Sequence, residues 1–121
     1  MADDNKRTAP RAAADFVAEL YDTGGQALIG IAKLTNLSIS GACVESTSLF
    51  DPKTQMVIRL LLGKRHLLTL PGQVVWVRVR GHVREYGIKF GAFPESAKSL
   101  ILRFVEEYFG QKKGIDFNEV L

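Results

Sequence analysis

Two arginines near the start of the chain have the spacing of a clamp for an anion. Arg7 and Arg11 are four positions apart, with Thr8-Ala9-Pro10 between them. A guanidinium group is a planar fork of donors that matches phosphate oxygens and also the O6/N7 edge of guanine. Residues 1–15 show no apolar period, so we expect a mobile arm that closes on an anionic ligand from outside the folded domain. Two solvated arginines are the alternative interpretation.

A second polar motif begins 25 positions after Arg11 and reads Asn36-Leu37-Ser38-Ile39-Ser40-Gly41. Asn36 and Ser38 are two apart, so on an extended segment they point the same way and offer hydrogen bonds to a base edge. Gly41 permits a backbone geometry or a close approach that a Cβ atom would block. The same residue types also suit an Asx/Ser turn that joins two strands.

The sequence contains no catalytic or metal-binding motif that we can identify. The two histidines, His66 and His82, stand among basic residues, and we interpret both as surface residues. Cys43, the single cysteine, lies on an expected strand, which predicts a buried and inert thiol. Gly24-Gly25 lacks the lysine and the spacing of a phosphate-binding loop. We therefore predict a non-enzymatic protein without a metal or a cofactor.

The elements that must position these motifs are short strands. In the first of them, Phe16, Ala18 and Leu20 share one apolar face. Alternation and Gly/Pro turns predict strands over 16–21, 27–35, 41–45, 55–62, 66–80 with a bend at Pro71-Gly72, and 83–90. Six strands without intervening helices favour an all-β fold, an antiparallel barrel or a sandwich.

The hydrophobic period changes to that of a helix after residue 93. Apolar residues then form one stripe, at Ala97, Leu100, Ile101, Phe104, Val105 and Tyr108. This stripe predicts one amphipathic helix over 94–110, with Pro94 in its first turn. We expect the helix to cap the β-structure, and a dimer seam is the alternative. Residues 111–121 are expected to form a loose tail.

Two aromatic residues are candidates for stacking on a base or on a partner, namely Trp76 and Tyr86. Strict alternation places Trp76 on one strand face with Val74, Arg78 and Arg80. Because that face is mixed, we expect Trp76 to be partly exposed or covered by the helix. A structural packing role is the favoured interpretation.

Length and composition define the class of protein. The chain has 121 residues, of which 46% are hydrophobic and 24% charged, and this suits one soluble domain over 1–121. A net charge of +3 is too small to indicate nucleic-acid binding by itself. No apolar run approaches the roughly 20 residues of a membrane-spanning helix, and the start of the chain does not resemble a secretory signal. We therefore expect a cytoplasmic protein without a membrane association.

The two polar motifs together resemble the signature of the PilZ domain family. Arg-x-x-x-Arg is followed by Asn-x-Ser-x-x-Gly, and residues 72–77 and 86–90 resemble the last strand pair of that family. The resemblance extends from Arg7 to about Gly110, including the closing helix. It implies a six-stranded antiparallel β-barrel over 13–93 with a flexible arm over 1–12. It also implies binding of the bacterial second messenger cyclic di-GMP.

The resemblance assigns a role to each residue of the two motifs. Arg7 and Arg11 would wrap over the ligand and meet phosphate and guanine, Asn36 and Ser38 would read guanine, and Gly41 would be a conformational requirement. Lys6 occupies the position that influences whether one or two ligands bind. Binding would order the arm and change the surface offered to an unidentified partner protein.

Two other functions are alternatives at this point. The first is a PilZ-like adaptor that acts through protein contacts without the nucleotide, and the presence of both motifs argues against it. The second is a small β-barrel that binds single-stranded nucleic acid through a strip of Arg78, Arg80, Arg84 and Trp76. The modest net charge argues against this second function.

Overall fold

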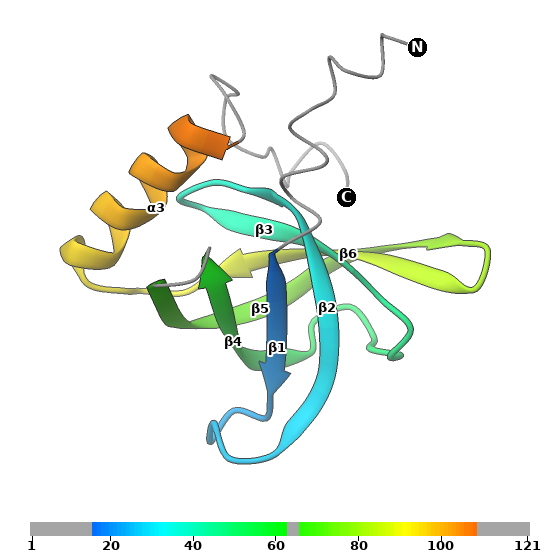
Figure 1. The fold of residues 1–121 in the computed structure, drawn as a ribbon. Coiled ribbons are helices and arrows are strands. Elements are labelled where there is room, and N and C mark those ends of the chain that lie inside the picture. Colours follow the sequence, from blue (N-terminus) through cyan, green and yellow to red (C-terminus); the bar gives the residue numbers. More distant parts are fainter. Residues whose placement is uncertain (1–15, 63–65, 109–121) are drawn as a thin grey trace, which may run out of the picture.

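The computed structural model describes residues 16–62 and 66–108, which form six strands and one helix (Figure 1). The elements are β1 (Val17–Tyr21), β2 (Leu28–Leu37), β3 (Gly41–Ser46), β4 (Gln55–Leu62), β5 (His66–Arg80), β6 (Val83–Phe90) and α3 (Glu95–Tyr108). The strands close into a barrel in the order β1-β2-β3-β6-β5-β4, and every pairing is antiparallel. The predicted barrel is therefore confirmed, and the sandwich is not formed. The expected arm over 1–12, the connection over 63–65 and the tail over 111–121 lie outside the described residues.

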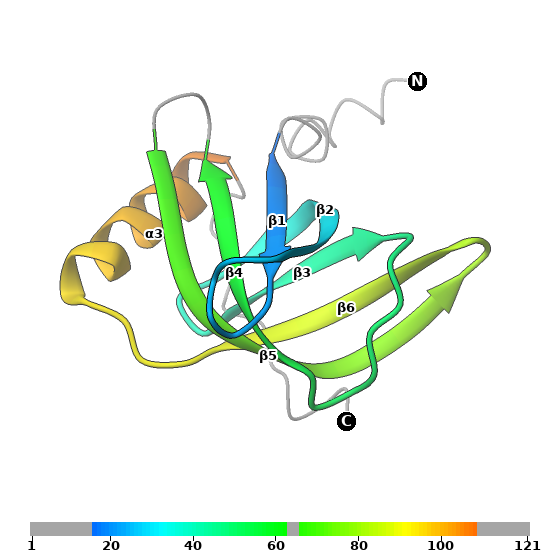
Figure 2. The same ribbon diagram turned by 90° about the horizontal axis from the view of Figure 1, so that it is seen from below.

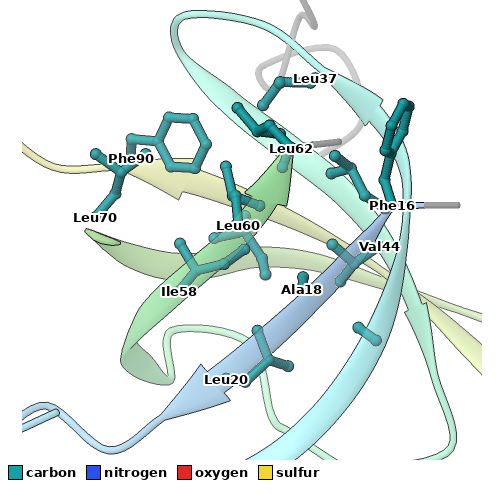
Figure 3. Packing of buried hydrophobic residues seen from close by; sticks show 14 of the residues in the cluster. Phe16, Ala18, Leu20, Leu37, Val44, Ile58, Leu60, Leu62, Leu70 and Phe90 are labelled. Carbon is teal, nitrogen blue, oxygen red and sulfur yellow. The ribbon is translucent and has the colours of Figure 1, made fainter. Parts of the chain in front are cut away.

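Alternate residues of the strands fill the interior of the barrel (Figure 3). Ala18 and Leu20 of β1 are fully buried, as their alternation predicts, and they lie opposite Leu60 and Ile58 of β4. Burying one such leucine or isoleucine side chain contributes about 1.5–3 kcal/mol relative to leaving it in water. The alternating pattern of the sequence is thus the pattern of the core.

The helix α3 caps the barrel, as expected. Its Ala97, Ile101 and Phe104 belong to the same buried cluster as the strand interiors. The ring of Phe104 meets the ring of Phe16 edge-on, with the centroids 4.8 Å apart. The Pro94 carbonyl accepts a hydrogen bond from the Ala97 N–H at 3.0 Å, so this proline stands at the start of the helix. These contacts assign the apolar stripe to the barrel and not to a dimer seam.

Strand β5 changes its neighbour along its length. It pairs with β4 from His66 to Gln73 and with β6 from Gly72 to Arg80. The expected bend at Pro71 is a curve within one continuous strand, which Figure 2 shows from below. Past Gln73, β5 is paired with β6, which is itself paired with β3 from Lys89 to Arg84. Only the tip of the β5–β6 ribbon projects beyond β3 (Figures 1 and 2).

Tyr86 is an interior residue of this strand pair and is fully buried. Its hydroxyl donates to the Ser48 carbonyl at 2.5 Å and accepts from the Phe50 N–H at 3.0 Å. The interpretation of Tyr86 as a residue that stacks on a base or on a partner is therefore wrong. The residue instead fixes the loop between β3 and β4 to the core.

A candidate ligand face on the outside of the barrel

Two bulges determine which residues face outward on the barrel. The β2–β3 register shifts between Leu34 and Asn36, and the β5–β6 register shifts between Val74 and Trp76. A bulge adds one residue to one strand and so inverts the alternation beyond it. Val74 accordingly belongs to the barrel core, whereas Trp76 belongs to a separate cluster. The prediction that these two residues share a face is wrong for this reason.

One row of outward positions crosses four neighbouring strands. Asn36 of β2 lies opposite Cys43 of β3, Cys43 lies opposite Gly87 of β6, and Gly87 lies opposite Trp76 of β5. We call these four residues the outer row. Its indole lies directly on Gly87, because a Cβ atom added at this glycine would overlap Trp76 Nε1. A glycine is therefore required under the indole.

Trp76 is more completely packed than the sequence suggested. Its side chain is 8% exposed, and its described apolar neighbours are Cys43 and Val75. No residue of α3 belongs to this cluster. The expectation of partial exposure or a cover by the helix is wrong, and the structural packing role is confirmed. Within residues 16–62 and 66–108, the buried Nε1 of Trp76 finds no hydrogen-bond partner.

Arginine side chains lie over and beside the outer row. The Arg78 guanidinium is 5.1 Å from the centroid of the Trp76 ring, and its Nη1 donates to Glu85 Oε1 at 3.3 Å. Arg80 approaches the same carboxylate at 3.6 Å. Two half-exposed arginines thus share a single acid. Lys33 and Glu45 lie in the same cross-strand row as Glu85, so this face carries three cations and two acids. This small surplus of positive charge suits an anionic ligand.

Cys43 sits in the middle of the outer row and is 8% exposed. Burial, followed by the negative charge of Glu85, raises the pKa of the Cys43 thiol to about 11. The thiol is therefore protonated near neutral pH, where only a thiolate would act as a nucleophile. The predicted buried thiol is confirmed, and its inertness stays a prediction.

The outer row ends beside the turn that carries the motif Asn36 to Gly41. The Ser38 N–H donates to the Gly41 carbonyl at 2.9 Å, and the Ser38 Oγ accepts from the Ser40 N–H at 3.1 Å. The Ser40 carbonyl accepts from the Phe90 N–H at 2.9 Å, which ties the turn to β6. The motif is therefore a serine turn between β2 and β3, one of the two predicted interpretations. A bulge and a turn replace the extended segment that the other interpretation required.

The three motif residues differ in what they present to a ligand. The Asn36 Oδ1 accepts from the Leu37 N–H at 2.9 Å, and its amide nitrogen has no partner in the part of the chain that the structure describes. Ser38 is 5% exposed, and its hydroxyl lies 2.9 Å from that of Ser40. Gly41 is buried and does not have a positive φ, so a left-handed backbone is not the reason for this glycine. Asn36 is thus the donor, and Ser38 mainly shapes the turn.

The point where residues 1–15 join the barrel lies close to this turn. The Leu34 N–H donates to the Phe16 carbonyl at 3.1 Å, two residues before Asn36. An open hollow of about 420 Å³ lies next to Phe16, and its lining includes Ile31, Lys33 and Glu45. Lys6, Arg7 and Arg11 lie outside the described residues. The structure therefore brings Asn36, Ser38 and Gly41 together. It does not describe where Arg7 and Arg11 lie relative to them.

Comparison with known proteins assigns this barrel to a family. The family model of the PilZ domain matches residues 5–107. The chain belongs to the PilZ domain family. Its fold is similar to the "PilZ domain with c-di-GMP of YcgR from Escherichia coli", with a TM-score of 0.63 and 9% identity over 78% of this chain and 81% of that chain. The PilZ domain of CeSA from a cellulose-synthesizing bacterium gives a TM-score of 0.50 and 18% identity over 78% of this chain and 90% of that chain. No curated protein matches the chain.

The PilZ match spans both the arginine motif and the asparagine–serine motif, since Arg7 and Gly41 fall within residues 5–107.

Across 16–62 and 66–108, no helix is long and apolar enough to cross a membrane, and no group of acidic, histidine or cysteine residues could hold a metal. Both histidines, His66 and His82, are exposed, as predicted. The sequence analysis missed the role of Glu85 and the contact between Gly87 and Trp76. A glycine inside a strand pattern is the one signal that could have indicated the latter.

Proposed function

We propose that this PilZ domain is a non-enzymatic receptor for cyclic di-GMP, which binds on the outside of the barrel beside the 38–41 turn. One observation carries the proposal: the Phe16 carbonyl is hydrogen-bonded to the Leu34 N–H, next to the asparagine–serine motif. A chain spans at most about 3.3–3.6 Å per residue. Arg11 therefore lies within roughly 18 Å of Phe16, and Arg7 within roughly 32 Å. Both arginines can reach over the turn.

The chemistry of the ligand agrees with these groups. Cyclic di-GMP has two phosphates and two guanines, so it requires cations and hydrogen-bond donors. Arg7 and Arg11 supply guanidinium groups, and the Asn36 amide supplies donors that have no partner among the described residues. A hydrogen bond to a charged group is worth about 1.5–3 kcal/mol. Three or four of them, less the cost of ordering the arm, are consistent with micromolar binding of about −8 kcal/mol.

Trp76 has a supporting role in this proposal. At 8% exposure the indole offers little ring surface to a base. The Arg78 guanidinium, by contrast, is half exposed and lies 5.1 Å from the ring centroid. A guanidinium plane can pair with phosphate and can also stack on an aromatic base. We therefore propose that Trp76 positions Arg78 and does not itself stack on guanine.

Calorimetric titration tests the receptor function. We expect heat from cyclic di-GMP and far weaker binding of cyclic di-AMP and GTP, because adenine replaces the guanine O6 acceptor with a donor. Arg7→Ala and Arg11→Ala should each weaken binding roughly 10- to 150-fold without a change in melting temperature. Arg103→Ala, on the exposed side of α3, removes the same charge elsewhere and should have no effect. Equal affinity for cyclic di-AMP, or unchanged affinity in both arm variants, would contradict the proposal.

We further propose that the ligand fixes residues 1–12 and so changes the surface offered to a partner. Fixing each residue costs about 1–2 kcal/mol, which the arginine–phosphate contacts must offset. Amide hydrogen exchange should show new protection of residues 5–12 when cyclic di-GMP is added. Binding should weaken as salt is added, since part of the attraction is between charges that water reaches. Protection that is already complete without ligand would show that the arm is a preformed part of the domain.

A further inference from the structure

Within residues 16–62 and 66–108, the distal half of β5 has one edge without a strand beside it. The β4–β5 pairing ends at Gln55 and Gln73, whereas β5 continues to Arg80. Val74 still exchanges backbone hydrogen bonds with the preceding loop, through Lys53 at 2.7 Å and Thr54 at 2.9 Å. From Val75 to Arg80, every backbone pairing recorded for the described residues is with β6. Among the residues that the structure describes, these six therefore have no strand on the side away from β6.

The alternation of an antiparallel pair shows which backbone groups this edge presents. Arg80 and Val83 flank the two-residue turn Gly81-His82, and in such a hairpin the flanking pair is hydrogen-bonded. Counting back from Arg80, the N–H and C=O groups of Val79 and Val77 point away from β6. The Val79 side chain is 61% exposed, so this stretch is accessible. An unpaired row of this kind is a template for an added strand.

The side chains next to the open edge select the charge of that strand. Arg78 and Arg80 face outward with side chains 54% and 55% exposed, and they share the single carboxylate of Glu85. With Arg84, the ribbon from Arg78 to Glu85 carries three arginines and one acid. A second copy of this edge would bring arginines against arginines, which is unfavourable for cross-strand pairs. A strand with acidic residues at alternate positions would instead find cations opposite them.

We propose that the edge from Val75 to Arg80 binds an extended, acidic segment of a partner protein by strand addition. The backbone supplies the affinity and the two arginines supply the preference for acidic side chains. Single-stranded nucleic acid suits the edge less well, because it cannot complete a ladder of N–H and C=O groups. The Trp76 ring, 8% exposed, is also a poor surface for stacking bases. This interaction surface shares Arg78 with the ligand face proposed above, so its test relies on Arg80 and on the backbone of Val77 and Val79.

The test uses a fluorescent eight-residue peptide in which valine and glutamate alternate. Two control peptides have the same composition with the glutamates in one block, or lysine in place of glutamate. Fluorescence polarisation should show binding of the alternating acidic peptide alone. Hydrogen exchange followed by NMR should show protection of the Val77 and Val79 amides in the complex. No binding at millimolar concentration, or equal binding of the lysine peptide, would overturn the proposal.

Two variants of the full chain locate the peptide. Arg80→Glu replaces attraction by repulsion, leaves the Arg78–Glu85 pair in place, and should weaken binding roughly 3- to 30-fold. Arg103→Glu on α3 is the matched charge change and should have no effect. Val79→Pro removes the open-edge N–H of residue 79 without removing a bond to β6. In this variant the peptide should no longer protect the Val77 amide.

Two further outcomes would each replace the proposed partner by another. An oligothymidine that binds and is weakened by Arg80→Glu, without protection of Val77 and Val79, would assign the ribbon to nucleic acid. A concentration-dependent dimer that Val79→Pro dissociates would assign the edge to a second copy of the chain. Neither outcome would bear on the cyclic di-GMP titration, so the two proposals fail separately.

Discussion

Tyr86 and Trp76 lie on the two faces of the same strand pair, and the structure uses them differently. Tyr86 points inward, is fully buried, and uses its hydroxyl to hold Ser48 and Phe50. Trp76 lies outside on a glycine, with its Nε1 unpartnered among the described residues and an arginine over its ring. A tyrosine whose polar atom is satisfied inside the barrel indicates a role in stability. A tryptophan that supports a cation on the outer face indicates a role in the proposed site.

The largest expected effect is on the inner side of this comparison. Tyr86→Ala should lower the free energy of unfolding by about 3–5 kcal/mol, because it leaves a cavity and two unsatisfied backbone groups. Urea denaturation followed by circular dichroism measures this change. The affinity of the remaining folded protein for cyclic di-GMP should stay within a factor of two. A stable variant that has lost binding would reverse the roles given to the two faces.

The reactivity of the Cys43 thiol measures how far solvent reaches the outer row. Its pKa of about 11, against the ordinary 9.0, means that alkylation by iodoacetamide at pH 8 should be roughly 100-fold slower in the folded protein than in urea. Because the folded pKa is the higher one, the free energy of unfolding should fall as the pH rises from about 9 to about 11. Equal rates in both states would show that the row is open to solvent.

Gly87→Ala tests the contact under the indole. The added Cβ atom would overlap Trp76, whose displacement should cost about 1–3 kcal/mol and change the fluorescence of the only tryptophan. Gly24→Ala is the matched control, because its Cβ would meet nothing closer than Asp22 Oδ1 at 3.8 Å. Equal stability of the two variants would mean that Trp76 can move without loss.

The smallest effect is expected on β1 and β4, away from the outer row. Arg59 donates to Glu19 Oε1 at 3.2 Å and to the Tyr21 hydroxyl at 3.0 Å, and both partners of the ion pair are partly exposed. Glu19→Gln should therefore change the free energy of unfolding by less than about 1 kcal/mol and leave the ligand affinity unchanged. A larger loss in urea denaturation, or weaker binding of cyclic di-GMP, would extend the functional face around the barrel.

The strands could be predicted from the sequence because burial in this barrel follows strict alternation over most of its length. Ala18 and Leu20, or Ile58 and Leu60, show this alternation. Trp76 could not be placed in this way, because the bulge after Val74 inverts the pattern and leaves no mark in the composition. The asparagine–serine motif could be recognised as a candidate site. Its geometry depends on the bulge before Asn36 and on bonds to β6, which are set by distant residues.

The edge-on contact between Phe16 and Phe104 gives this small domain a short mechanical connection. Phe16 is where residues 1–15 meet the barrel, and Phe104 lies one turn from the end of α3. A displacement of Phe16 would therefore act on α3 through this ring pair and on β2 through the hydrogen bond from the Leu34 N–H. Interiors packed this tightly transmit such strain instead of absorbing it. The start of the described chain and the C-terminal part of α3 are thus coupled through one aromatic contact.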